Sequence, residues 1–239
     1  MLFRSDRRRV FDARRIVASV FDEGSFFEIG RYQGGSIITG LARLDGHPVG
    51  LMCGDPRVAG GAMTLAAAWK VERLVKLCDT FGLPMVNLVD QPGNATGPEA
   101  ELSGTLLGAV RVMTTIETIR IPWVSIILRR AFGMAGGLHA PKYFPQLNHR
   151  FAWPSARWGS IPIEGGVAAA YRTEINQAGD PEQRRVEIEA YYHQLASPFR
   201  TAEKFGILDV IDPRETRSIL CDWVTDAYEM LRAVRQPVR

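Results

Sequence analysis

The sequence is poor in cysteine, lysine and histidine, and each shortage excludes a kind of chemistry. Its 3 cysteines lie far apart without paired spacing, which argues against a disulfide framework and indicates a reducing compartment. Its 4 histidines form no H-E-x-x-H or related pattern, so we predict no metal site in this chain. Only 4 of the 29 basic residues are lysines, which leaves few groups for amine chemistry.

Several familiar motifs are also missing. There is no Walker phosphate loop, no G-x-G-x-x-G after the first strand and no G-x-S-x-G elbow, which disfavours nucleotide binding and serine hydrolysis. No apolar run is as long as a membrane span, and we find no export signal. With 29 basic and 26 acidic side chains, neither a nucleic acid nor a membrane is expected as a partner. These absences predict a cytoplasmic protein.

The densest basic run, RSDRRRVFDARR, occupies residues 4–15. Val10, Phe11 and Ile16 have helical spacing there, which predicts a basic N-terminal helix within residues 1–20 whose charged face is solvated. Binding of RNA or of an acidic partner is the alternative interpretation. Residues 1–5, MLFRS, also match what a sequencing-adapter end would encode, so we expect this start to be truncated or artefactual.

The rest of the chain alternates between apolar strands and amphipathic helices. Two strand-like runs, residues 37–44 and 48–53, flank Asp45-Gly46, a dipeptide that favours a tight hairpin turn. Further strand-like pieces and helices are predicted at residues 151–161, 163–171, 184–195, 207–211 and 213–231. This alternation indicates an α/β fold, with one domain over residues 21–239.

Between these parts a helix-strand unit occurs twice. A helix over residues 63–81, ended by Gly82, precedes a strand over residues 84–89 that is predicted to be covered on both faces. A second helix over residues 102–116 precedes a strand over residues 122–128. The predicted buried face of the second helix consists of Leu102, Leu106, Ala109, Val110, Met113 and Ile116.

The most informative stretch is IILRRAFGMAGGL, residues 126–138. Its apolar run breaks at Arg129-Arg130 and continues through a small-residue turn, Gly133 to Gly137, into a predicted helix start. Such a turn leaves backbone N–H groups unpaired, and glycine lets a ligand approach the backbone closely. Backbone donors of this kind can stabilise a developing negative oxygen. Close packing alone is the alternative explanation of the glycines.

A second candidate segment, DQPGNATGPEAE, occupies residues 90–101. A long loop at the carboxyl end of a buried strand is where open α/β sheets place ligands. Asp90 and Glu101 could act as an acid/base pair, or they could orient the loop by accepting hydrogen bonds from backbone N–H groups. We predict that this loop contacts substrate through Asp90, Pro92, Gly93, Gly97 and Glu101.

Six segments, read in order, resemble one family. They are FDEGSFFE, GLARLDGHPVGLMCGDPRVAGGAMT, LVDQPGNATGPEAELSG, RRAFGMAGGL, FAWPSARWGSIPIEGG and SPFRTAEKFGILDVIDPRETR. Together they are similar to the carboxyl-terminal half of the carboxyltransferase (beta) subunits of biotin-dependent acyl-CoA carboxylases, including the propionyl-CoA, methylcrotonyl-CoA and acetyl-CoA enzymes. The resemblance implies a ligase or transferase of fatty acid or branched-chain metabolism.

The resemblance also implies a fold and a mechanism. The fold is of the crotonase (ClpP/crotonase-like) type, built from repeated strand-strand-helix units with flanking helices. In the family, carboxybiotin releases carbon dioxide, the ureido anion takes a proton from the acyl-CoA, and the resulting enolate attacks the carbon dioxide. The amino-terminal half binds acyl-CoA, and the half found here binds carboxybiotin. Biotin is carried on a separate protein or domain.

The resemblance assigns site residues to two glycine-rich turns. The backbone oxyanion hole falls on Gly133, Met134 and Ala135, with the N–H groups of Met134 and Ala135 as donors. Since a glycine is common at Met134, its side chain is expected to point away from the ligand. The predicted cofactor-binding residues are Gly60, Gly61, Gly136 and Gly137. Tight packing at a helix start is the alternative role of Gly60 and Gly61.

The implied partners are a biotin carboxylase and biotin carrier subunit, an acyl-CoA-binding amino-terminal half, and further copies of the chain in a homo-oligomer. Two other functions stay open at this point. One is a crotonase-type enoyl-CoA hydratase or isomerase, for which Glu164 is the nearby candidate acid. The other is a catalytically silent, truncated fragment that lacks the acyl-CoA-binding half.

Overall fold

The structure is a computed structural model that describes residues 9–139, 147–160, 162–204 and 206–235, without the side chains of Glu164 and Arg235. The prediction for residues 1–5 therefore lies outside the described residues. The strands are β1 Phe27–Glu28, β2 Ile37–Leu44, β3 His47–Gly54, β4 Met85–Gln91, β5 Trp123–Phe132, β6 Asn148–Ala152, β7 Arg157–Gly159 and β8 Asp209–Val210. The helices are α1 Ala13–Val20, η1 Ala59–Gly61, α2 Leu65–Phe81, α3 Pro98–Leu102, α4 Thr105–Thr118, α5 Gly133–Gly137, α6 Ile163–Ala170, α7 Arg172–Gln177, α8 Pro181–Leu195, α9 Pro198–Ala202, η2 Pro213–Glu215 and α10 Thr216–Arg235.

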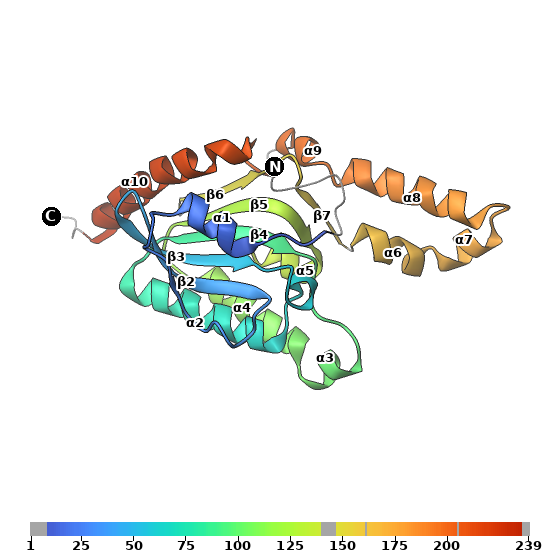
Figure 1. The fold of residues 1–239 in the computed structure, drawn as a ribbon, viewed down its shortest axis with the longest axis horizontal. Helices are drawn as coiled ribbons and strands as arrows, with labels where there is room; N and C mark the ends of the chain where they lie inside the picture. Colours follow the sequence, from blue (N-terminus) through green and yellow to red (C-terminus); the bar gives the residue numbers. More distant parts are fainter. Residues whose placement is uncertain (1–8, 140–146, 161, 205, 236–239) are drawn as a thin grey trace.

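One mixed sheet of eight strands forms the centre of the fold, in the order β1-β2-β3-β4-β5-β6-β8, with β7 paired to β5. Helices α2 and α4 cover one face, and α1 and α10 cover the other (Figure 1). The predicted hairpin is confirmed: β2 and β3 pair antiparallel, and Asp45 and Gly46 have the positive φ angles, 48° and 77°, that a tight turn between such strands requires. From β3 onward the pairing is parallel, so the strands through β6 end at a common edge.

The first helix-strand unit agrees with the prediction. Helix α2 begins after Thr64, whose side chain accepts a hydrogen bond from the N–H of Ala67, and ends at Gly82 in the left-handed conformation. Every residue of β4 is buried, as expected for a strand between two helical layers. The central strands are therefore rigidly placed at the edge where the candidate site lies.

The second predicted helix is wrong in its bounds and in part of its buried face. It is divided into α3 and α4, because Gly104 takes a left-handed φ of 79° between them. Leu102, Leu106 and Val110 are exposed, with 89%, 63% and 39% of their surface accessible. Gly108 explains the rotation, because it lacks a Cβ and lets Leu65 of α2 pack closely against α4.

Two further boundaries differ from the prediction. Helix α1 begins only at Ala13, where the Asp12 side chain accepts a hydrogen bond from the N–H of Arg14, so Arg9 precedes the helix. Strand β5 does not break at Arg129-Arg130 but continues to Phe132, because β7 extends the ladder from Arg130 onward. The start of α1 has a local cause, the Asp12 cap, whereas the extension of β5 depends on β7, which lies far from Arg130 in the sequence.

Helices α6, α7 and α8 form an arm that extends from the sheet (Figure 1). Ile163, Val167 and Ile188 pack in the arm around Phe132, the last residue of β5. The helices predicted at residues 163–171 and 184–195 correspond to α6 and α8, and the later predictions correspond to β8 and α10. Among the described helices, none combines the length and apolarity needed to cross a membrane.

Candidate functional site

The candidate site begins at the carboxyl end of β5. Gly133 follows the strand with a φ of 62°, a conformation that favours glycine, and the chain turns directly into α5. The first N–H groups of a helix have no acceptor within it. In the part of the chain that the structure describes, the N–H groups of Met134 and Ala135 also have no acceptor outside α5. These two N–H groups are the donors that the family resemblance assigned.

The side chains of the turn point into the fold. Ala135 is fully buried, and Met134 packs against the hydrophobic cluster between the sheet and helices α2 and α4. A Cβ on Gly136 would lie 2.3 Å from the carbonyl carbon of Ala131, so Gly136 has a packing reason to be glycine. A Cβ on Gly137 would meet no atom within 4 Å. The space beside the turn is therefore open at Gly137 and closed at Gly136.

A buried carboxylate joins β4 to β5 beside this turn. Asp90 is fully buried, and its Oδ2 lies 2.7 Å from Nη2 of Arg129, while its Oδ1 lies 2.8 Å from Nε of Arg130. Burial raises the pKa of Asp90, but the hydrogen bonds from Arg130 and Arg129 outweigh it and hold that pKa below its ordinary value. Asp90 is thus an ionised internal link whose oxygens are occupied by arginines.

The same cluster holds the turn at η1. Nη2 of Arg130 donates to the carbonyl of Gly60 at 2.8 Å, and Nε2 of Gln91 donates to the carbonyls of Gly61 and Gly93. Gly60 and Gly61 have positive φ angles of 62° and 89°. The carbonyls of Gly60 and Gly61 thus face the cluster, while a Cβ on Gly60 would meet no atom within 4 Å.

The structure brings some of the predicted site residues together and separates others. A Cβ on Gly61 would lie 3.5 Å from Cδ of Pro92, and one on Gly93 would lie 3.9 Å from the carbonyl oxygen of Phe132. The beginning of the acidic loop therefore adjoins both η1 and the α5 turn. The end of the loop does not, because Gly97 and Glu101 belong to the start and body of α3, which projects from the sheet (Figure 1).

The suggested acid/base pair is not present in the structure. The Asp90 carboxylate binds two arginines, whereas Glu101 is exposed on α3. The alternative, that Asp90 accepts hydrogen bonds from backbone N–H groups, is also wrong in its donors, because the side chains of Arg129 and Arg130 donate instead. Glu164, the candidate acid of a hydratase, has a side chain outside the described residues.

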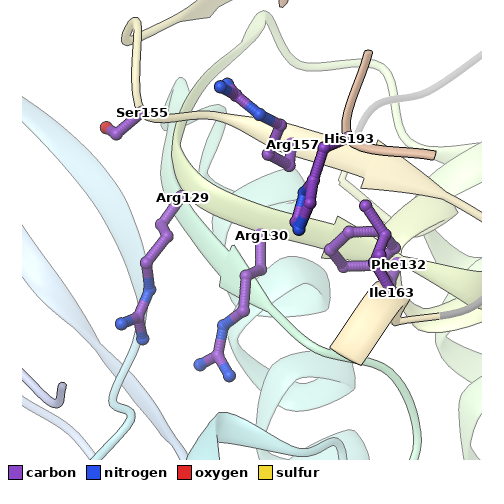
Figure 2. A pocket seen from close by; sticks show the side chains of 7 residues that line it. All are labelled: Arg129, Arg130, Phe132, Ser155, Arg157, Ile163 and His193. Carbon is purple, nitrogen blue, oxygen red and sulfur yellow. The ribbon is translucent and has the colours of Figure 1, made fainter. Parts of the chain in front are cut away.

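Sequence reasoning missed the arginines as partners of Asp90. Arg129 and Arg130 extend side by side from β5, and the side chain of Arg157 extends in another direction (Figure 2). They border a small pocket that is lined by Arg129, Arg130, Phe132, Ser155, Arg157, Ile163 and His193. The sequence feature that could have revealed this is the pair Arg129-Arg130, directly before the glycine-rich turn. If the strand continues through these two arginines, they need an acidic partner.

Comparison with known proteins identifies the family. Residues 3–233 match the model of the carboxyl transferase domain, and the chain therefore belongs to the carboxyl transferase family. It is 34% identical over 214 residues to a propionyl-CoA carboxylase carboxyltransferase subunit of Haloferax mediterranei, covering 89% of this chain and 41% of that protein. It is 30% identical to the methylmalonyl-CoA carboxyltransferase 12S subunit of Propionibacterium freudenreichii subsp. shermanii, covering 97% and 43%.

Solved structures show the same likeness. A transcarboxylase 12S crystal structure with methylmalonyl-CoA bound, described as a hexamer assembly, matches with a TM-score of 0.86 and 27% identity, over 100% of this chain and 45% of that one. A single-chain, multi-domain long-chain acyl-CoA carboxylase matches with a TM-score of 0.82 and 30% identity, over 95% and 22%. The chain thus spans less than half the length of these relatives.

Proposed function

We propose that this chain is the carboxybiotin-binding half of a biotin-dependent acyl-CoA carboxyltransferase. The observation that carries the proposal is the α5 turn at the carboxyl end of a buried parallel strand, where the N–H groups of Met134 and Ala135 have no acceptor among the described residues. Membership of the carboxyl transferase family supports the reaction class. The carboxyl group is transferred to the α- or vinylogous carbon of an acyl-CoA.

The residues of the turn fit such a ligand. Gly133 turns the chain out of β5 with a φ of 62°, and the Met134 side chain packs against the core, away from the proposed ligand. When bound, carboxybiotin would supply the carboxyl group, and its ureido oxygen would gain negative charge as that group leaves. The two N–H groups stabilise that oxygen by hydrogen bonds, and loss of one such donor costs about 3–4 kcal/mol of transition-state stabilisation.

The neighbouring glycines complete the proposed cofactor surface. Gly137 and Gly60 have open space at the position of a Cβ, which leaves the backbone accessible there. Gly61 and Gly136 lie on the side of this surface that faces the sheet, because each packs against backbone atoms of a strand. Asp90, Pro92 and Gly93 shape the substrate side of the site next to the turn. Gly97 and Glu101, on the projecting end of the loop, contact substrate only in the assembled enzyme.

The proposal includes the partners of the chain. The acyl-CoA thioester is bound by an amino-terminal half, and the chain spans 41% to 43% of the first two relatives. A biotin carboxylase and biotin carrier subunit deliver carboxybiotin, and the assembled enzyme is a homo-oligomer. We further propose that the fold is of the crotonase type and that residues 21–239 form the carboxyltransferase domain after a basic segment within residues 1–20.

Reconstitution tests this proposal. The chain is mixed with a carboxylated biotin carrier and propionyl-CoA, with and without an amino-terminal half expressed separately, and carboxyl transfer is followed. We expect transfer only when both halves are present. Hydration of an enoyl-CoA by the chain alone, or the absence of transfer by both halves together, would contradict the proposal.

A substitution tests the assigned donors. Ala135→Pro removes one N–H group and is expected to lower the transfer rate about 10²- to 10³-fold. Gly179→Ala, at an open position between α7 and α8 outside the proposed cofactor surface, serves as the control and is expected to retain wild-type transfer. Circular dichroism and thermal melting establish that both variants are folded. Unchanged transfer by folded Ala135→Pro would refute the assignment.

A further inference from the structure

A buried group of four side chains holds the end of the α5 turn against the sheet. Nδ2 of Asn87 on β4 lies 2.8 Å from Nδ1 of His139. The Ser125 hydroxyl on β5 donates to the carbonyl of His139, and Nε1 of Trp123 lies 3.1 Å from the same carbonyl oxygen. All four residues are at most 5% exposed. None of these contacts involves Asp90 or its two arginines.

The network fixes the turn at its second end. The chain leaves the sheet after Phe132, passes through α5, and returns to the middle of the sheet at His139, where Asn87 and Ser125 are register partners. Between the two ends, Gly133, Gly136 and Gly137 give the backbone more freedom than other residues would. The direction of the N–H groups in the turn therefore depends on how firmly both ends are held.

The ring of His139 is suited to this role as a neutral group. An amide nitrogen only donates, so Nδ1 accepts the hydrogen bond from Asn87 and the ring carries its proton on Nε2. Within the described residues, Nε2 has no hydrogen-bond partner. Burial, followed by the charge of Arg150, lowers the pKa of His139 to about 3, which keeps the ring neutral at physiological pH.

We propose that His139 is a positioning residue that holds the α5 turn in register with β4 and β5, so that the N–H groups of Met134 and Ala135 point at the reacting oxygen. The proposal rests on the proposed function of the turn. It adds a residue that lies outside the glycine-rich motif and contacts neither substrate nor cofactor. Misdirection of such donors by about 1 Å is enough to cost about a hundredfold in rate.

Three variants of the full chain test the proposal. His139→Leu removes the acceptor for Asn87, His139→Gln restores an oxygen acceptor, and Ser125→Ala removes one donor to the His139 carbonyl. His47→Leu, at the end of the hairpin, is the matched histidine control. NMR order parameters of the Met134 and Ala135 N–H bonds are measured, together with kcat and KM for transfer with the separate amino-terminal half.

The expected results distinguish a role of His139 in orienting the N–H groups from a role in the stability of the fold alone. In His139→Leu the order parameters of the two N–H bonds fall from about 0.85 toward 0.6, and kcat falls at least about tenfold with KM within about twofold. His139→Gln recovers most of both quantities, and His47→Leu matches the wild type. Ser125→Ala, which changes less volume, shows a smaller loss of the same kind and decides the matter if His139→Leu does not fold.

Other outcomes would overturn the proposal. Wild-type order parameters and kcat in folded His139→Leu, or in Ser125→Ala if only that variant folds, would exclude the positioning role, as would His139→Gln behaving like His139→Leu. The order parameters require no activity. If the wild type performs no transfer, the proposed function fails, while the mobility of the turn still decides whether His139 holds it.

Discussion

Two buried polar networks join the same pair of strands, β4 and β5, but they use different chemistry. At the edge of the sheet, Asp90 is held by Arg129 and Arg130 as an ion. In the middle of the sheet, Asn87 and Ser125 hold His139 through neutral groups. A carboxylate between two guanidiniums must stay charged, whereas a fully buried imidazole must stay neutral. The two ends of the candidate site are thus stabilised by groups with opposite requirements.

The charged network gives the largest expected effect. Asp90→Asn removes the charge that compensates Arg129 and Arg130, and we expect the free energy of unfolding to fall by about 3–5 kcal/mol because the buried Arg129 and the half-buried Arg130 lose their shared carboxylate. Urea denaturation at pH 7 measures the change. Glu101→Gln, on the exposed face of α3, is the control and should stay within about 0.5 kcal/mol of the wild type. Equal stability of both variants would mean that the cluster is not a structural link.

The neutral network should make the free energy of unfolding depend on pH through His139. The folded-state pKa of His139 is lowered to about 3 from an ordinary value of 6.5. Below pH 6.5 His139 therefore takes up a proton in the unfolded chain but not in the folded chain. The stability that the neutral His139 ring contributes is present above pH 6.5 and is lost as the pH falls toward 3. The slope is about 1.4 kcal/mol per pH unit.

Comparison of the wild type with His139→Leu isolates that contribution. Between pH 6.5 and pH 5, the wild type should lose about 1.6 kcal/mol more in its free energy of unfolding than the variant, since all other titrating groups are common to both. Urea denaturation at several pH values measures both curves. Parallel curves would show that the His139 ring is not held neutral in the fold.

Arg130 should show a smaller effect within the charged network. Arg130→Met removes the hydrogen bonds to Asp90 and to the Gly60 carbonyl but leaves Arg129 on the carboxylate, so we expect a loss of about 1–2 kcal/mol. Arg214→Met is the matched control, because Arg214 pairs with Asp212 at the surface with 89% of its side chain exposed. A loss as large as that of Asp90→Asn would mean that the two arginines act only as a pair.

The sequence predicted most of the central fold because local signals agreed there. Asp45-Gly46, Gly82 and the apolar run at residues 84–89 each have a short-range cause, and the structure confirms the hairpin, the helix end and the buried strand. The second helix failed because the close approach of Leu65 to Gly108 turns the smaller residues inward. No periodicity within residues 102–116 reveals that contact.

The candidate site divides in the same way. A strand, a small-residue turn at Gly133 to Gly137 and a helix start could be predicted from the chain, because these depend on neighbours in the sequence. The partners of Asp90 and His139 could not be predicted, because they lie on adjacent parallel strands that are far apart in sequence. The chain alone thus predicted a turn whose backbone N–H groups could act as donors. Tertiary structure decided which buried charges and hydrogen bonds hold them in place, since only folding brings β4 and β5 together.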